Sequence, residues 1–408
     1  MSLEFNKIIT KVESMGRWLA RRDPNLDDRL EEAIALYEAS TDLEKIYRRI
    51  HIVRQSSVSG YRGAAPPDPE YAEILPTRVS RPPLPPLTTI IASDGSQIYP
   101  DRHTYPRYYL LNIGLFTYYC GVDKRPEQYT LPQLYYTSKA LRDQRKRLIN
   151  RITVDARRSV REVEILSQHA QRLKEDTGTL ITLVDNRLLF FVGSNVTGAD
   201  KIMNDYRKAL MRLHRADALL AGYVDSPQDS RQIIRLLYLL DMDEQKVYHT
   251  DMRGLGKFDA LTDIQLMRKV LKPGERSAIM VPNSPTNADY RESFGLDYEI
   301  AFFFVNVARD LRPHIARVDL PMWVAKDKDS IDALHAAVVS QCAIQGNKPY
   351  PYALTRADEL AYVSGKDREK LEELIRIEMR KWLMNPGMTA KQSTKNLARG
   401  FKRRHKLK

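Results

Sequence analysis

Residues 87–96 read LTTIIASDGS, and this stretch decides the fold that we predict. Leu87 to Ser93 is apolar and β-branched, which is typical of a buried strand, and Asp94-Gly95-Ser96 predicts a turn at which the strand ends. The stretch Thr179 to Val184 (TLITLV) repeats the arrangement, because it is an apolar strand that stops at Asp185. The sequence therefore predicts two buried strands that each present an aspartate at the carboxyl end.

The segments around these strands complete an α/β pattern. Tyr108–Tyr119 predicts a second strand and Gln133–Tyr136 a short third one, and periodicity over Ser138–Lys174 predicts one long helix. Further along we predict helices at 200–220, 228–241 and 261–271, strands at 277–282, 299–306 and 314–320, and a helix from Ala357 to Met384. The order strand, strand, strand, helix, strand is that of an RNase H-like mixed sheet flanked by helices. Acidic residues of the first strand, the helix and the fourth strand converge on metal ions in that architecture.

The two ends of the chain differ from this central part. Residues 1 to about 52 carry apolar side chains at helical spacing, which predicts a helical hairpin within an N-terminal helical region at 1–65. Eight prolines between Pro66 and Pro86 predict an extended linker or arm at 66–86, because proline removes backbone donors. An RNase H-like domain at 87–375 follows, and the end of the last helix with a basic tail occupies 376–408.

Composition and charge restrict the function classes. Of 408 residues, 43% are hydrophobic and 29% are charged. No apolar run approaches the roughly 20 residues that span a bilayer, so we expect a cytoplasmic protein without membrane insertion. Cys120 and Cys342 show no CxxC or Cys/His spacing, which disfavours a disulfide framework and a zinc site.

The net charge of +13 is concentrated at one end of the chain. Residues 380–408 contain ten Lys and Arg and no acid, which favours contact with a polyanion such as DNA. A solvated tail without a partner is the alternative interpretation. Tyr99 and Tyr105, interleaved with Arg102, His103 and Arg107, are candidates for stacking the bases of a single strand. Tyr108 and Tyr109 belong to the same stretch, where they fit the core of a strand equally well.

Carboxylates are the candidate metal ligands. An ionised carboxylate at the end of a buried strand is costly unless it is solvated, paired or bound to metal, and Asp94 and Asp185 both hold such a position. A turn-capping role is the alternative for either one alone. In the helix between them, Glu162 and Glu164 sit about 200° apart around the axis, so only one can face the sheet. We favour Glu164, whose neighbours one turn away look more buried; two surface glutamates are the alternative.

These residues resemble the motifs of a known family. The stretch IIASDGSQIYPDRH resembles the first motif of the NurA nucleases. TLVDNRLLFF resembles the second, with Asp185 kept and the family's Gly-Ser replaced by Asn186-Arg187. AGYVDSP, LKPGERS, ARVDLPMWVA and YPYALTRADELA follow in the family's order, so the resemblance covers roughly residues 88 to 375.

The resemblance implies the remaining site residues. The family's last motif presents a Tyr and, eight residues later, a His beside the metals, and these positions are Tyr350 and Asp358 here. Asp binds Mg²⁺ and Mn²⁺ at least as well as His does, although a helix N-terminal Asp is an equally good interpretation. Asp319, in ARVDLP, is an alternative acid that also fits a structural role. The expected catalytic residues are thus Tyr350 together with four metal ligands: Asp94, Glu164, Asp185 and Asp358.

The resemblance also implies an activity and partners. It implies a Mn²⁺-stimulated 5′ to 3′ exonuclease that also cuts single-stranded DNA, in end resection and repair, as a homodimer with a hexameric HerA-type ATPase. Two ions, Mn²⁺ or Mg²⁺, would respectively activate water and stabilise the leaving oxygen. The chain has no G-x-x-x-x-G-K-[ST] run, so DNA translocation would need ATP hydrolysis by the partner.

Two other classes remain compatible with the sequence. The first is a catalytically inactive RNase H-like DNA-binding or assembly protein, which the changed turn at Asn186-Arg187 favours. The second is an RNase H-like enzyme that acts on RNA, because none of these motifs reads a 2′-hydroxyl. Cleavage assays with Mn²⁺, Mg²⁺ or EDTA separate these classes from a deoxyribonuclease.

Overall fold

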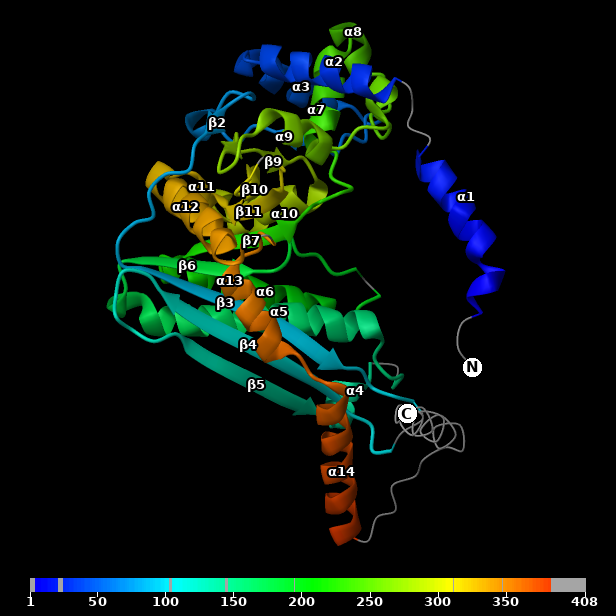
Figure 1. The fold of residues 1–408 in the computed structure, drawn as a ribbon, viewed down its shortest axis with the longest axis vertical. Helices are drawn as coiled ribbons and strands as arrows, with labels where there is room; N and C mark the ends of the chain where they lie inside the picture. The colour runs from blue at the N-terminus through cyan, green and yellow to red at the C-terminus, as the bar shows by residue number, and fades with distance from the viewer. Residues whose placement is uncertain are drawn as a thin grey trace.

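The computed structural model describes residues 4–20, 25–102, 105–143, 146–193, 195–310, 312–346 and 348–382. Its centre is a nine-stranded sheet. The strands of this sheet are β2 (Arg78–Val79), β3 (Thr88–Ile98), β4 (Tyr109–Tyr119), β5 (Glu127–Tyr135), β6 (Thr179–Val184), β7 (Leu219–Asp225), β8 (Arg276–Ser277), β10 (Ile300–Asn306) and β11 (Ile315–Pro321). They lie in the order β2-β8-β10-β11-β7-β6-β3-β4-β5 (Figure 1). A second, two-stranded sheet pairs β1 (Ala64–Ala65) with β9 (Val281–Pro282).

Helices surround the sheet. The α-helices are α1 (Ile9–Ala20), α2 (Leu26–Ala39), α3 (Leu43–Gln55), α4 (Ser138–Leu141), α5 (Arg151–Leu173), α6 (Ala199–Arg215), α7 (Gln232–Asp241), α8 (Glu244–Val247), α9 (Asp263–Val270), α10 (Pro285–Phe294), α11 (Met322–Ala325), α12 (Lys328–Ile344), α13 (Tyr352–Ala361) and α14 (Gly365–Lys381). Short 3₁₀ helices are η1 (Phe5–Lys7), η2 (Pro69–Tyr71), η3 (Lys174–Asp176), η4 (Gly256–Phe258) and η5 (Leu296–Tyr298). Among the described residues, no helix has the length and apolar character needed to cross a membrane.

The strand directions confirm the predicted fold class. β3, β4 and β5 form an antiparallel meander, and β6 and β7 continue the sheet parallel to β3. This is the RNase H-like arrangement that the order of the elements predicts. β11 and β10 extend it on the far side of β7 as antiparallel strands. The sheet is therefore mixed, and the parallel strands β3, β6 and β7 lie at its centre.

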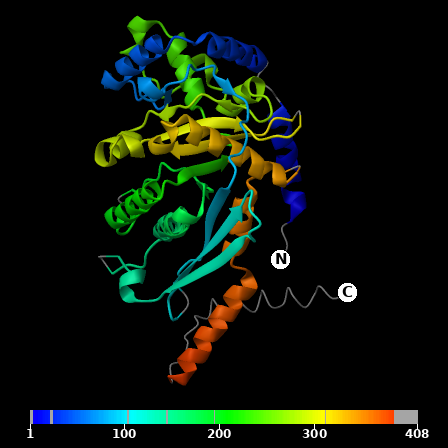
Figure 2. The ribbon, with the colours of Figure 1, turned by 90° about the vertical axis from the view of Figure 1, so that its left-hand side faces the viewer.

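Two helices pack on opposite faces of β3 and β4. Asp94 pairs with Gly114, and Gly95 pairs with Ile113. Paired residues share a face of the sheet and successive residues alternate, so these two pairs lie on opposite faces. A side chain at Gly95 would meet α5, whereas a side chain at Gly114 would meet α13. Hence α5, with α6 beside it, covers one face and α13 covers the other (Figure 2).

The N-terminal helices belong to one end of the body. At the top of Figure 1, α2 packs against α7 and α9, and α3 packs against α7 and α8. The buried residues of α2 and α3 join the core cluster that includes the sheet. The proline-rich segment at 66–86 contains η2 and β2, and β2 forms the edge of the large sheet beside β8. At the opposite end of the molecule, α14 extends away from the sheet (Figure 1).

The strand that opens the domain is longer than predicted. β3 continues through Asp94, Gly95 and Ser96 to Ile98, because all of these residues pair with β4. The prediction of a turn at Asp94 is therefore wrong, and Asp94 lies within a paired strand. β6 ends at Val184 as predicted, and Asp185 follows it directly.

Two predicted helices are each interrupted. The helix predicted at 138–174 consists of α4 and α5, and Asn150 caps α5 by accepting a hydrogen bond from the Thr153 amide at 2.8 Å. The helix predicted at 357–384 consists of α13 and α14, and Ser364 caps α14. Caps are ordinary polar residues, so helical periodicity alone does not locate such breaks.

Several other boundaries also differ from the sequence prediction. The short strand predicted at 133–136 is the end of the longer β5, whose mostly exposed residues give no strong apolar pattern. The helix predicted at 200–220 ends at Arg215, and β7 at 219–225 was not predicted. The strand predicted at 277–282 is divided between β8 and β9, and α12 was not predicted.

Candidate active site

Asp94 and Asp185 lie next to each other on neighbouring strands. The last paired residues of β3 and β6 are Ser93 and Val184, so Asp94 and Asp185 are the next residues along two parallel chains. Neighbouring strands are roughly 4.8 Å apart. Burial and the carboxylates of Asp358 and Asp185 raise the pKa of Asp94 to about 6, against the effect of the Gly95 amide, which donates to Asp94 Oδ1 at 2.7 Å. The two aspartates therefore repel each other at close range.

Glu162 of α5 approaches these aspartates where β3 has no side chain. A Cβ atom at Gly95 would lie 2.5 Å from Glu162 Oε1, a distance that real Cβ atoms do not tolerate. The Glu162 side chain is only 6% exposed. Burial, together with Asp94 and Asp185, raises the pKa of Glu162 to about 8, although the Arg158 guanidinium, 3.4 Å away, opposes this rise. The glycine after Asp94 thus makes room for a second buried carboxylate.

Glu164 points away from the aspartates. Its side chain is partly exposed and forms an ion pair with Arg161 at 3.1 Å. The prediction that Glu164, and not Glu162, faces the sheet is therefore wrong. The physical reason is that α5 packs both on β3 and on α6, so buried neighbours occur on more than one side of the helix. Apolar neighbours could not identify the side that faces the acids.

Asp358 is brought to the site by the close packing of α13 on β4. A Cβ atom at Gly114 would lie 2.1 Å from the carbonyl oxygen of Ala357, so only glycine permits this approach. Ser96 Oγ and Asn112 Nδ2 donate to the Ala361 carbonyl at 2.5 and 2.8 Å, which fixes the end of α13. The Asp358 side chain is exposed, and it contributes more than Asp185 to the raised pKa of Asp94.

Tyr350 is positioned on Asp185. Its hydroxyl donates a hydrogen bond to the Asp185 carboxylate, which lowers the pKa of Asp185, whereas burial raises that pKa more strongly. Asp185 is accessible to solvent, but the protein atoms around it reduce the solvation of its carboxylate enough to raise its pKa. The Tyr350 ring packs edge-on against Tyr223 of β7, with 5.4 Å between the ring centroids. Tyr350 therefore holds one carboxylate in place.

Asp225 and Asp319 are two further acids that the sequence or the fold brings into question as site residues. Asp225, at the end of β7, raises the pKa of Asp185 and lies 2.6 Å from His314 Nε2. It was not predicted, although AGYVDSP ends an apolar run with an aspartate much as β6 is followed by one, because no strand was assigned between the helices predicted at 200–220 and 228–241. Asp319 is fully buried, pairs with Arg317 Nε at 2.6 Å and accepts from the Leu188 amide, so it serves the fold.

We call Asp94, Glu162, Asp185 and Asp358 the acidic cluster. Within the described residues, no three His, Cys, Asp or Glu side chains lie close enough together to hold one ion. The donors are nevertheless all carboxylate oxygens, which suit Mg²⁺ or Mn²⁺. Among the described residues, Glu162 Oε1 is also buried without a hydrogen-bond partner and has only the Arg158 guanidinium 3.4 Å away, which is costly unless a proton or a bound cation satisfies the oxygen. By type and electrostatics, the cluster fits a hard divalent cation.

The basic and aromatic candidates divide into three groups. Residues 383–408 of the predicted basic tail and His103 lie outside the described residues. Tyr108 and Tyr109 are buried, and Tyr109 stacks on Tyr135 with 4.4 Å between ring centroids, so both belong to the core. Tyr99 is partly buried beside a surface cavity, and Tyr105 is 58% exposed.

The chain is similar to a known domain in sequence and to several solved nucleases in structure. The family model for the NurA domain matches residues 88–363. The NurA nuclease from Sulfolobus solfataricus is 14% identical over 85% of this chain and 97% of its own, with a TM-score of 0.46. A NurA structure with manganese is 12% identical over 73% and 90%, with a TM-score of 0.33, and the catalytic domain of human Endonuclease V is 12% identical over 85% and 98%, with a TM-score of 0.30. None of the curated proteins matches the chain.

Proposed function

Because the chain belongs to the NurA nuclease family, we propose that it is a divalent-metal-dependent deoxyribonuclease that hydrolyses phosphodiester bonds at the acidic cluster. The observation that carries this proposal is the position of Asp94 and Asp185 on adjacent parallel strands, with Glu162 buried beside them and one of its oxygens unsatisfied. Structural carboxylates are normally hydrogen-bonded when buried, as Asp319 is to Arg317, whereas the Arg158 guanidinium near Glu162 Oε1 makes no hydrogen bond to that oxygen. An unsatisfied carboxylate between two others is better explained by a cation.

The residues of the cluster would divide the work of holding cations. Asp94 would bind from within β3, Asp185 from the end of the adjacent β6, Glu162 from the α5 side and Asp358 from the α13 side. Bound Mn²⁺ or Mg²⁺ would supply activation of a water molecule and stabilisation of charge on the phosphate and the leaving oxygen. Tyr350 would keep the Asp185 carboxylate oriented through its hydroxyl. Arg158, between Glu162 and the Gly95 carbonyl, would limit the repulsion within the cluster.

The finer activity rests on the family resemblance of the sequence. We propose a 5′ to 3′ exonuclease and single-stranded DNA endonuclease that uses two Mn²⁺ or Mg²⁺ ions and acts in end resection and repair. The sequence has no phosphate-binding loop, which supports a HerA-type hexameric ATPase as the partner that drives DNA translocation. We propose that this chain works with that partner as a homodimer. The excess of Lys and Arg at 380–408 supports DNA as the substrate.

A cleavage assay tests the nuclease proposal. End-labelled single-stranded and duplex DNA would be incubated with the native protein in Mn²⁺, Mg²⁺ or EDTA, beside Asp94→Asn. We expect cleavage only with metal and only by the native protein. The variant Asp310→Asn is a matched control, because Asp310 is an exposed surface residue paired only with Arg312 in the described part of the chain. Cleavage in EDTA, or full activity of Asp94→Asn, would contradict the proposal.

The second candidate function is a DNA-binding or assembly protein without catalysis. The observation that favours it is that no three described acidic or histidine side chains stand within reach of a single ion. Under this alternative, the native protein would bind labelled DNA equally well with Mn²⁺ and with EDTA and would leave it intact. RNA in place of DNA in the same assay tests the third class, an RNase H-like ribonuclease.

A further inference from the structure

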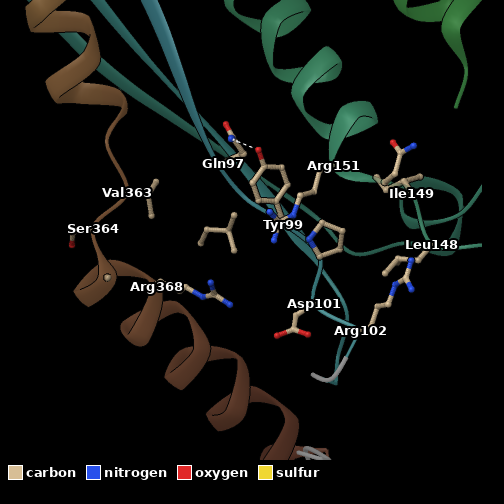
Figure 3. A pocket seen from close by; sticks show the side chains of 14 residues that line it. Gln97, Tyr99, Asp101, Arg102, Leu148, Ile149, Arg151, Val363, Ser364 and Arg368 are labelled. Carbon is tan, nitrogen blue, oxygen red and sulfur yellow. Dashed lines mark hydrogen bonds between the residues drawn. The ribbon is translucent and has the colours of Figure 1, made fainter. Parts of the chain in front are cut away.

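A surface cavity of about 700 Å³ lies at the end of β3, the strand that carries Asp94. Its walls come from the segment that follows β3, the start of α5 and the start of α14 (Figure 3). Each wall supplies one arginine: Arg102 after β3, Arg151 on α5 and Arg368 on α14. Asp101 is the single carboxylate among the described lining residues. The cavity therefore carries a positive excess at the end of a strand that belongs to a strongly acidic site.

Within the described residues, two of these arginines have no carboxylate partner. No ion pair joins Arg102 or Arg151 to a described acid, and the Arg151 guanidinium lies over the Tyr99 ring, 5.0 Å from its centroid. Arg368 pairs with Glu372 at 2.9 Å. Guanidinium groups that converge on a concave surface attract an anion, and their planar donors match the oxygens of a phosphate. The composition of the cavity thus indicates a phosphate-bearing ligand.

The walls of the cavity are fixed to the strands that carry the site. Ile98 of β3 packs with Val363 and with the first turns of α14 in one apolar cluster. The Ala361 carbonyl, just before this junction, accepts hydrogen bonds from Ser96 and Asn112. On the other side, Tyr99 donates to Asp155 of α5 at 2.6 Å. A ligand in the cavity would therefore have a fixed position relative to Asp94.

The separation from the acidic cluster suits one nucleic acid strand. Asp94 and Gln97, the first lining residue, are three positions apart on an extended strand, which is about 10 Å at roughly 3.3 Å per residue. Successive phosphates of one strand rise about 3.4 Å along a helix axis, so this distance corresponds to a few nucleotides. A strand that places one phosphate at the acids can therefore place a neighbouring phosphate in the cavity.

We propose that this cavity binds the backbone phosphates of the substrate strand a few nucleotides away from the bond that is cut, with Arg102, Arg151 and Arg368 as the contacting groups. The proposal rests on the proposed function for the identity of the strand, and it assigns to the arginines a role in holding that strand. It also accounts for arginines beside a carboxylate-rich site, where phosphates would otherwise be repelled.

The test is the salt dependence of DNA binding. Binding of a labelled single-stranded oligonucleotide would be measured in EDTA, which prevents metal-dependent cleavage, for the native protein and for Arg102→Gln/Arg151→Gln. Each lost phosphate contact lowers the slope of log affinity against log salt by about 0.7 for single strands, so the double variant should lose about 1.4. Between roughly 50 and 200 mM salt, the native protein should then lose about sevenfold more affinity than the variant does.

The control is Arg253→Gln/Arg312→Gln, which changes the net charge equally but removes exposed arginines that pair with Asp251 and Asp310. We expect the control to keep the native slope, and thermal melts to show both variants folded. An unchanged slope in the cavity variant, or the same loss in the control, would overturn the proposal. Inorganic phosphate distinguishes a free anion from a strand. In one outcome, phosphate raises the melting temperature of the native protein but not of the cavity variant, while both proteins bind the oligonucleotide alike. The cavity is then a site for free phosphate, and the strand proposal fails.

The outcomes also separate this proposal from the proposed function. If the native protein never cuts DNA with any metal but the cavity variant loses the expected slope, the nuclease proposal fails, and the cavity remains a phosphate site for a bound strand that is not cut. If the native protein cuts DNA and the cavity variant keeps the native slope, the nuclease proposal stands and the cavity proposal fails.

Discussion

Replacement of Glu162 by glutamine changes how the stability of the metal-free protein depends on pH. Folding raises the pKa of Glu162 from 4.5 to about 8, mainly by burial. At 1.36 kcal/mol per pH unit, ionising this group in the folded protein costs about 5 kcal/mol. Because the folded value lies above the unfolded one, the contribution to stability is fully present below pH 4.5 and is lost as the pH rises toward 8.

The variant Glu162→Gln cannot ionise and should lose this dependence. Between pH 5 and pH 8, the native protein in EDTA should lose about 4 kcal/mol of unfolding free energy that the variant keeps. The buried glutamine amide and the loss of the ion pair with Arg158 change the stability by about 1–3 kcal/mol at every pH. The readout is therefore the slope of unfolding free energy against pH and not the absolute stability. Urea denaturation in EDTA at several pH values measures it.

Glu164→Gln is the matched control, because Glu164 lies two residues away and pairs with Arg161 near the surface. Its stability should follow the native pH dependence. In cleavage assays with Mn²⁺, Glu162→Gln should lose activity and Glu164→Gln should keep it. The reasoning is refuted if Glu162→Gln retains the native slope, or if the slope disappears in Glu164→Gln instead.

Three other changes test the same site. Because protons and cations compete for carboxylates whose pKa values reach about 6 and about 8, Mn²⁺ affinity should rise between these pH values and binding should release protons, which calorimetry in two buffers detects. Gly95→Ala places a methyl group 2.5 Å from Glu162 Oε1 and should cost about 1–3 kcal/mol of stability and most of the activity, whereas Gly16→Ala, with nothing within 4 Å, should cost neither. Tyr350→Phe removes a hydrogen bond that lowers the pKa of Asp185, so the acid limb of the pH–activity profile should move to higher pH; an unmoved limb would contradict the role of Tyr350.

The sequence predicted those parts of the site that depend on local signals. The ends of apolar runs identified Asp94 and Asp185, and their strands proved to be adjacent and parallel. The choice between Glu162 and Glu164 depends on which side of α5 meets β3, and this is set by packing between segments far apart in the sequence. Asp225 was missed because the helix predicted at 200–220 took in Leu219 and Leu220, and the short stretch left before the next helix was not recognised as a strand.

The three residues of the first motif contribute in different ways, and this explains why the second motif tolerates a different sequence. Asp94 supplies a carboxylate, Gly95 leaves room for Glu162, and Ser96 holds the end of α13 through the Ala361 carbonyl. All three lie inside paired β3, between α5 and α13, so a side chain at residue 95 has no free space. Asn186 and Arg187, which replace the family's Gly-Ser, lie after the end of β6 and are exposed. Asn186 Oδ1 accepts a hydrogen bond from the Arg187 amide at 2.8 Å, which stabilises this turn locally. The exchange at 186–187 therefore leaves Asp185 in place, whereas the same exchange at 95–96 would separate Asp94 from both Glu162 and Asp358.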